Sequence, residues 1–313
     1  MAYDLKSYLV VGISSSALFD LTTEHNIFET KGLDEYLKYQ IEHEKDILKP
    51  GPGFKLVKNL LRLNELIPHK RLVEVIIMSR NSASSSLRFF NSIEHYGLDI
   101  SRAALTSGMP IKPYAEAFNV ALFLSTNVED VQDAINGNIA AGLIYNYEYQ
   151  HDDNRKQIRI AFDGDAVLFS DESERIFQKE GLDAFAQHEK QNALKPLPEG
   201  PFAKLLKAIS RIQKEFINLE MPIRTALVTA RSSPAHERVI RTLQVWDVKI
   251  DEVFFLGGVR KAEILKAFGA DIFFDDQDAH LKYTADVVPS ARVPYKNLSE
   301  QISLFEDRED SDD

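Results

Sequence analysis

The feature that most constrains the fold of this chain is an internal repeat at an offset of 150 residues. Three separated pairs of segments align at this offset: 14–19 (SSSALF) with 164–169 (GDAVLF), 76–79 (IIMS) with 226–229 (ALVT), and 118–125 (FNVALFLS) with 268–275 (FGADIFFD). Three matches at one offset indicate a duplicated structural unit. We therefore expect two copies of one plan rather than a single undivided domain.

Both halves alternate short apolar runs with helical segments. Residues 9–13 (LVVGI) and 158–162 (IRIAF) are apolar runs typical of strands that are buried on both faces of a sheet. Pro234 stands near the start of one helical segment and Gly269 at the end of another. Strands that alternate with helices predict an α/β fold with parallel sheets of Rossmann type, whose ligands lie beyond the carboxyl ends of the strands.

The repeat predicts the domain organisation. We expect one copy over residues 1–150 and a second over residues 151–300, followed by an acidic, solvated tail over residues 301–313. Each copy contains a helical insert after its first strand, over about residues 21–73 and 171–224. The position of these inserts is that of a cap over the carboxyl edge of the sheet.

Composition narrows the classes of function. The 313 residues have a formal net charge of −11, which argues against nucleic acid or an anionic membrane as the main partner. A small anion is still compatible, because a bound metal and a few local bases can override the global charge. The absence of cysteine excludes disulfides, thiolate catalysis and cysteine-bound zinc. The apolar run over residues 8–13 is too short to span a bilayer, so we expect a cytoplasmic protein.

Six side chains suited to metal or phosphate chemistry stand at strand ends or helix starts of the second half: Asp163, Asp165, Thr229, Lys261, Asp275 and Asp276. The carboxyl ends of parallel strands meet at one edge of a sheet, so these groups are expected to converge. Each also has a purely structural interpretation. The aspartates could cap a turn or helix, Thr229 could be an ordinary strand-end hydroxyl, and Arg260 or Lys266 could replace Lys261 in its role.

The order of these groups, Asp-x-Asp, Thr, Lys and Asp-Asp, resembles the four motifs of the haloacid dehalogenase-like phosphohydrolases. One Asp-x-Asp is weak evidence, whereas the ordered set is specific. Residues 90–105 and 160–174 look like the cytosolic 5′-nucleotidase type I family, and the similarity extends over nearly the whole chain to about residue 300. The resemblance implies an enzyme that dephosphorylates nucleoside monophosphates, typically AMP, with magnesium.

The acidic groups themselves require a cation. Carboxylates that converge on one strand edge repel one another strongly in a partly dry site, and a divalent cation relieves this repulsion. Hard oxygen ligands with retained waters favour Mg²⁺. We expect Asp163 and Asp275 to bind it together with the main-chain carbonyl of Asp165, and Asp276 to bind it directly or through water. The sequence leaves open which of Asp275 and Asp276 is the direct ligand.

A mechanism follows from this arrangement. The Asp163 carboxylate is expected to attack phosphorus in line and form an aspartyl-phosphate. Asp165 is expected to protonate the leaving 5′-oxygen and then to deprotonate the water that hydrolyses the intermediate. Thr229 would bind a phosphoryl oxygen, and Lys261 would balance the negative charge of the transition state.

The first half lacks these groups and is expected to be a degenerate, catalytically inert copy, which together with the inserts shapes the nucleoside pocket. Its aligned positions carry no nucleophile or metal ligand: Ile13 for Asp163, Ser15 for Asp165, and Ser125 and Thr126 for Asp275 and Asp276. Polar strand ends remain, and Ser79 and Asn81 are candidates for binding part of the substrate. Structural capping of the strand ends is an equally favoured interpretation.

Three further candidates for substrate binding lie in the second half. Phe185 and His188 are three residues apart in one helical segment of the insert, a spacing that suits stacking on a base. A buried core contact is the competing interpretation for both. Arg231 is the third candidate.

The sequence therefore predicts a Mg²⁺-dependent 5′-nucleotidase that acts on nucleoside monophosphates, AMP favoured. The preferred base and sugar, allosteric control and the existence of a homo-oligomer are left open. One alternative is a phosphatase for another small phosphoester, such as a sugar phosphate. Another is a non-catalytic nucleotide-sensing module. Receiver domains also use Asp, Thr and Lys, but their paired acids come first in the chain, whereas here they come last.

Overall fold

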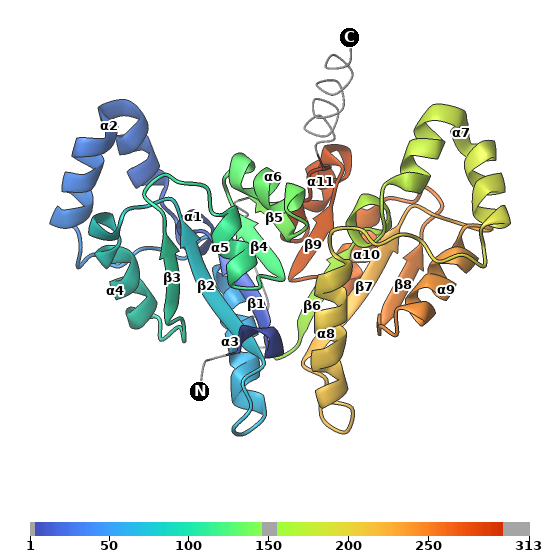
Figure 1. The fold of residues 1–313 in the computed structure, drawn as a ribbon, viewed down its shortest axis with the longest axis horizontal. Coiled ribbons are helices and arrows are strands. Elements are labelled where there is room, and N and C mark those ends of the chain that lie inside the picture. The colour runs from blue at the N-terminus through green and yellow to red at the C-terminus, as the bar shows by residue number, and fades with distance from the viewer. Residues whose placement is uncertain (1–3, 146–154, 297–313) are drawn as a thin grey trace, which may run out of the picture.

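Ten strands form one continuous sheet in the computed structural model, which describes residues 4–145 and 155–296 (Figure 1). The order across the sheet is β3-β2-β1-β4-β5-β10-β9-β6-β7-β8. The strands are β1 (Leu9–Ile13), β2 (Val73–Ser79), β3 (Arg102–Leu105), β4 (Leu122–Ser125), β5 (Ala140–Ile144), β6 (Ile158–Phe162), β7 (Ile223–Thr229), β8 (Glu252–Phe255), β9 (Ile272–Asp275) and β10 (Ser290–Arg292). All neighbouring strands pair in parallel except β5 and β10, so the expected α/β class with a largely parallel sheet is confirmed.

Helices cover both faces of this sheet. They are α1 (Ser15–Leu18), α2 (Thr22–Glu42), α3 (Phe54–Leu66), α4 (Leu87–His95), α5 (Lys112–Ala117), α6 (Val128–Asn136), α7 (Glu172–Gln191), α8 (Ala203–Glu215), α9 (His236–Val245), α10 (Lys261–Phe268) and α11 (Asp278–Thr284). In Figure 1, α6 and α11 lie near the top of the centre and α3 and α8 extend below it. Every residue of β1 is buried, as its continuous apolar run predicts for a strand that is covered on both faces, and every residue of β2 is buried as well, Glu74 included. No described helix combines the length and apolarity needed to cross a membrane.

The two halves share their strand order and several backbone conformations. The order β3-β2-β1-β4-β5 corresponds to β8-β7-β6-β9-β10. Left-handed backbone conformations recur in both halves near the repeat offset: Gly32 with Gly181, Gly97 with Asp247, Ser107 with Gly257, Gly108 with Gly258, and Asn119 with Gly269. The repeat seen in the sequence therefore has a counterpart in the backbone.

The halves do not form separate sheets. The sequence led us to expect two copies with sheets of their own, but β10 pairs with β5 through the register Ala291 to Ile144 and joins them. Because this pair is antiparallel, the strands of the second half run opposite to those of the first. The carboxyl ends of the two strand sets therefore lie at opposite edges of the sheet. The expected boundary near residue 150 and the tail over 301–313 lie outside the described residues.

Each helical insert divides into two parts. Helices α3 and α8 pack on the sheet, and the apolar side chains of Leu60 and Leu205 border the same small cavity beneath the central strands. Helices α2 and α7 instead project at the two upper corners of Figure 1. The part of the second insert that lies outside the sheet is therefore α7, and not the whole of residues 171–224 as expected from the sequence.

Candidate active site

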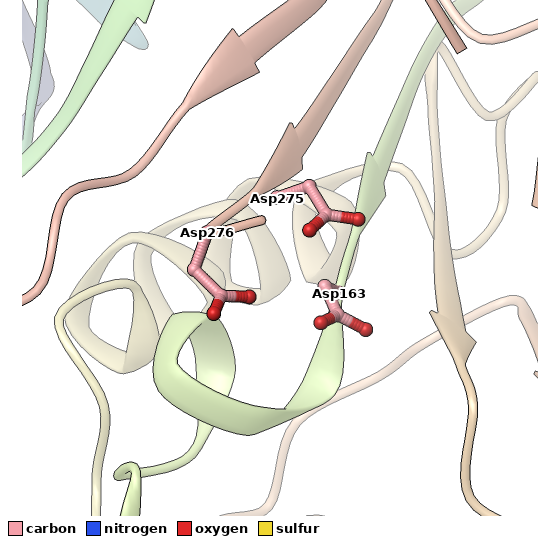
Figure 2. A group of neighbouring side chains, drawn as sticks. All are labelled: Asp163, Asp275 and Asp276. Carbon is pink, nitrogen blue, oxygen red and sulfur yellow. The ribbon is translucent and has the colours of Figure 1, made fainter. Parts of the chain in front are cut away.

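Three aspartates meet where β6 and β9 end side by side. Phe162 pairs with Phe274 in these strands, so the next residues, Asp163 and Asp275, are neighbours across the sheet. Figure 2 shows the carboxyl groups of Asp163, Asp275 and Asp276 around one space, and each offers an oxygen within 4.8 Å of the others. All three residues are buried. The structure thus brings together the acidic groups that the sequence placed at strand ends.

The electrostatics of this cluster fit a bound cation. Burial raises the pKa of Asp163 to about 6, in spite of the opposing charge of Lys261. Burial and the charges of Asp163 and Asp275 raise the pKa of Asp276 to about 8. In addition, Oδ1 of Asp276 is buried without a hydrogen-bond partner. A site made of carboxylate oxygens, one of them unpartnered, matches the ligand preference of Mg²⁺.

Lys261 lies between two of these carboxylates. It begins α10, and its Nζ is 2.9 Å from Oδ1 of Asp163 and 2.7 Å from Oδ2 of Asp275. The residue is buried, and the two carboxylates raise the pKa of its ammonium group although burial alone would lower it. Lys261 therefore stays charged beside the candidate nucleophile, and the alternative bases Arg260 and Lys266 are not needed for that position.

Asp165 turns away from the acidic cluster. After Asp163 the chain makes a tight turn over Gly164–Leu168, which is closed by a hydrogen bond from the Phe169 amide to the Gly164 carbonyl, and the carboxylate of Asp165 receives two hydrogen bonds from the Arg231 guanidinium. The distances are 2.8 Å from Nε to Oδ2 and 2.6 Å from Nη2 to Oδ1. The two aspartates of the Asp-x-Asp motif therefore have different partners: Lys261 for Asp163 and Arg231 for Asp165.

Thr229 ends β7 next to the turn that follows Asp163. It is buried, and its Oγ1 accepts a hydrogen bond from the Arg231 amide at 3.2 Å. A Cβ atom built on Gly164 would lie 3.2 Å from this Oγ1, so a glycine allows the turn and the threonine to approach closely. Thr229 thus lies beside the turn that follows Asp163, at the end of its strand.

Phe185 and His188 lie on α7, and Arg231 contacts the same helix. The Arg231 guanidinium lies 5.5 Å from the centre of the Phe185 ring, and Nδ1 of His188 is 3.3 Å from Glu189 Oε1. Arg231 is buried and bound to both Asp165 and Glu189. The structure therefore places the three predicted substrate-binding residues in one group, in which Arg231 is occupied by protein carboxylates.

Ser79 and Asn81 lie far from this group. Ser79 ends β2, which is six strand positions from β6, or roughly 29 Å along the sheet at about 4.8 Å per strand. The strand ends also lie at opposite edges. Ser79 and Asn81 instead bind Ser15, with an Oγ to Oγ distance of 3.0 Å and an Nδ2 to Oγ distance of 3.3 Å. One small substrate held at Asp163 cannot also contact them, so capping of the strand end is the better interpretation.

Four residues that contact the predicted site residues were not predicted from the sequence. Nδ1 of His280 is 3.1 Å from Asp275 Oδ2, and the Tyr295 hydroxyl donates a hydrogen bond to Asp276. Glu189 and Arg238 extend the contacts of Arg231. Only Glu189 left a signal in the sequence, because it lies four residues after Phe185 and so shares its helix face.

A pocket of about 340 Å³ opens beside the acidic cluster, at the junction of the two halves. Ala166, which follows Asp165, and Tyr295, which contacts Asp276, are among its lining residues. The first half contributes Ile135 and Asn138, and α8 contributes Lys204. The volume falls in the usual range for small-molecule pockets.

A model of the 5′-nucleotidase family matches residues 1–300. The chain belongs to the 5′-nucleotidase family. Among curated proteins, this family member is similar to human cytosolic 5′-nucleotidase 1B, with 40% identity over 287 residues that cover 88% of the chain. It spans only about half of that relative, 47% of its length. A chain from a structure titled "Structure of Pnkp1/Rnl/Hen1 complex" shares 13% identity over 93% of this nucleotidase-family chain and 97% of its own, with a TM-score of 0.32.

Proposed function

We propose that the protein is a Mg²⁺-dependent 5′-nucleotidase that hydrolyses nucleoside monophosphates, with AMP favoured, to nucleoside and phosphate. The observation that carries the proposal is the buried cluster of Asp163, Asp275 and Asp276 with Lys261 against it. Membership of the 5′-nucleotidase family and similarity to a protein named as a cytosolic 5′-nucleotidase support the substrate class and a cytoplasmic location.

We further propose that the chain consists of two haloacid dehalogenase-like copies, of which the first is inert. The repeated strand order and left-handed positions support the duplication. The positions that correspond to the ion pair of Asp163 and Lys261 are occupied by Ile13 and Ile111, both fully buried. Replacement of a buried ion pair by two apolar side chains preserves packing and removes the chemistry.

The proposed mechanism assigns work to each side chain of the second site. Asp163, Asp275, Asp276 and the main-chain carbonyl of Asp165 would hold Mg²⁺, which when bound neutralises phosphate charge. Asp163 attacks phosphorus, and the phosphorus to 5′-oxygen bond breaks as the new bond to the carboxylate oxygen forms.

Proton transfer and charge stabilisation are assigned to the neighbouring residues. Asp165 gives its proton to the departing 5′-oxygen and then takes one from the water that cleaves the aspartyl-phosphate, so the enzyme returns to its starting state. Lys261 and Thr229 stabilise the phosphoryl oxygens. The nucleoside is proposed to lie in the pocket at the junction of the halves, which adjoins the site through Ala166 and Tyr295.

A phosphate-release screen tests the proposal. Nucleoside monophosphates and sugar phosphates are compared by kcat/KM, each with and without Mg²⁺. The expected result is steady release of phosphate over many turnovers, highest for AMP and dependent on the metal. A higher kcat/KM for sugar phosphates would favour the other phosphatase, and binding of nucleotide without turnover would favour a sensing module.

A further inference from the structure

A chain of buried ion pairs connects Asp165 to the cap helix α7. Arg231 binds Asp165 through Nε and Nη2, and its Nη1 lies 2.5 Å from Oε2 of Glu189 on α7. The other oxygen of Glu189 accepts hydrogen bonds from Arg238 Nη1 at 2.8 Å and from the Ser173 hydroxyl at 2.9 Å. The charges alternate along Asp165, Arg231, Glu189 and Arg238.

The centre of this chain is cut off from solvent. Glu189 has no exposed surface, and Arg231 and Arg238 are each 4% exposed. Burial opposes the charge of Glu189, but Arg231, Ser173 and Arg238 hold its pKa below the ordinary value, so it is anionic at neutral pH. Removal of one member of such a buried group leaves an uncompensated charge. The position of Arg231 therefore depends on Glu189.

We propose that Glu189 is a positioning residue for the proton transfers at Asp165, and that it acts through Arg231. A carboxylate has about four acceptor sites, and a two-pronged arginine contact uses one on each oxygen. The fork of Arg231 thus fixes the plane of the Asp165 carboxyl group and leaves one position free on each oxygen, which can carry the proton donated to the leaving oxygen and can later accept the proton of the water. This inference rests on the proposed role of Asp165 as the acid and base.

The inert half shows that the fold does not require this link. There a buried pair, Glu24 and Arg88, likewise ties α2 to α4. Arg88 donates hydrogen bonds to Glu24 and to the main-chain carbonyl of Asp46, and these contacts do not reach the strand end. Ser15 and Asn81 occupy the positions of Asp165 and Arg231. Of the two halves as described, only the one with the candidate catalytic carboxylates therefore has ion pairs that continue from the cap helix to the strand end.

Glu189→Gln tests the proposal by the identity of the leaving group. Proton transfer typically contributes a factor of about 10² to 10⁴. With AMP, whose leaving alkoxide needs a proton, we expect single-turnover cleavage to slow by about tenfold to a hundredfold, since the acid is misplaced rather than lost. With p-nitrophenyl phosphate, whose leaving group needs little protonation, the burst of p-nitrophenol should keep its rate to within about twofold, and only the later hydrolysis should slow.

Three further variants separate a positioning role of Glu189 from a general loss of stability. Glu24→Gln makes the same change in the matched buried pair of the inert half, so it should lower the melting temperature without changing either rate. Arg231→Lys keeps the charge but loses the planar fork, and should reproduce the leaving-group pattern of Glu189→Gln. If circular dichroism shows Glu189→Gln to be unfolded, Glu189→Asp keeps the charge with a shorter reach and should show the same pattern with a smaller deficit.

The decisive variant is Glu189→Gln or, where that variant is unfolded, Glu189→Asp. The proposal is overturned if this variant slows cleavage of both substrates by the same factor, or of neither, while Asp165→Asn shows the leaving-group pattern. If Asp165→Asn itself leaves AMP cleavage unchanged, the assigned acid is wrong, and that result counts against the proposed mechanism of the site. The two failures are therefore distinguishable in one set of experiments.

Discussion

At the level of single residues, the two aspartates of the Asp-x-Asp motif differ in ways that their spacing does not reveal. Asp163 contacts Lys261 and lies in the acidic cluster, whereas Asp165 is held by Arg231. In the proposed mechanism the first binds the metal and attacks the phosphate. The second is held away from the cluster, where a proton donor to the leaving group would stand.

This difference predicts distinct defects for the two Asp→Asn variants. Asp163→Asn should remove the nucleophile and a metal ligand, so neither a burst nor a trappable phosphoenzyme should form with p-nitrophenyl phosphate. Asp165→Asn should retain the burst and lose mainly the slow second step, because the deficit lies in proton transfer. A burst from Asp163→Asn with silence from Asp165→Asn would mean that nucleophile and acid must be exchanged.

The acidic cluster predicts a response of stability to metal. Mg²⁺ that binds only the folded chain should raise its melting temperature. At a hundredfold excess of Mg²⁺ over Kd, the free energy of unfolding should increase by about 2.7 kcal/mol. EDTA should reverse the shift, measured by thermal unfolding. Asp275→Asn should weaken the shift, and Asp133→Asn, on α6 of the first half, serves as the control. An unchanged melting temperature for the wild type up to millimolar Mg²⁺ would contradict the proposed metal site.

Much of the candidate site could be predicted because its members lie at ends of apolar strands. Asp163, Thr229 and Asp275 each follow or end such a strand, and parallel strands bring their carboxyl ends together. Tyr295 and His280 could not be predicted, because they sit in a loop and a short helix with no periodic signal. The ion pair of Arg231 with Glu189 was also beyond prediction, although Glu189 shares a helix face with Phe185, since the pair depends on how α7 packs against the loop after β7.

At the level of elements, the helical inserts were predicted correctly as helices, but the sequence pattern did not show which of their helices packs on the sheet. Both helices of each insert looked alike as parts of a cap, but α8 has a continuous apolar face that includes Leu205, Leu206 and Ile209, all buried. In α7 the buried residues are Ser173 and Glu189. A helix with an apolar face packs on the sheet, whereas one that buries only polar groups is held by ion pairs.

Helix α8 supplies a test of the proposed nucleoside pocket. Lys204→Trp places a large ring at the edge of the pocket that Lys204 lines. We expect KM for AMP to rise several-fold, with little change in kcat, because the groups that carry out the chemistry are untouched. Arg211→Trp, at an exposed position of the same helix outside the residues lining that pocket, is the matched control. Equal KM values for the two variants would place the nucleoside elsewhere.

At the level of the whole molecule, the sequence predicted two copies but not their union. The pairing of β5 with β10 involves three-residue β10, whose one apolar residue, Ala291, carries no information about its partner strand. The contacts of α3 with β6 and of α8 with β1 join each half to the other. Such long-range contacts arise from surfaces that meet only after both halves have formed, so a pattern within either half cannot reveal them.

This union predicts that neither half folds alone. A fragment of residues 151–296 would lack β5 as the partner of β10 and β1 as the partner of α8, and would expose apolar side chains such as Leu205. Exposed sheet edges and apolar patches of this kind promote aggregation. We therefore expect the fragment to be insoluble or unfolded when produced alone, and to become soluble and active when produced with residues 1–145. The measurements are circular dichroism, sedimentation and phosphate release.

A protease site inserted between residues 146 and 154 separates the effect of losing the contacts between the halves from the effect of breaking the chain that connects them. Cleavage there breaks the chain outside the described residues and leaves the contacts between the halves unchanged. The two pieces of the cut protein should elute together in gel filtration and keep their activity, because the β5–β10 pair and the contacts of α3 and α8 with the opposite half hold them together. A soluble, active fragment of residues 151–296 would show that the first half is dispensable, and dissociation after cleavage would show that the contacts across the sheet are too weak to unite the halves.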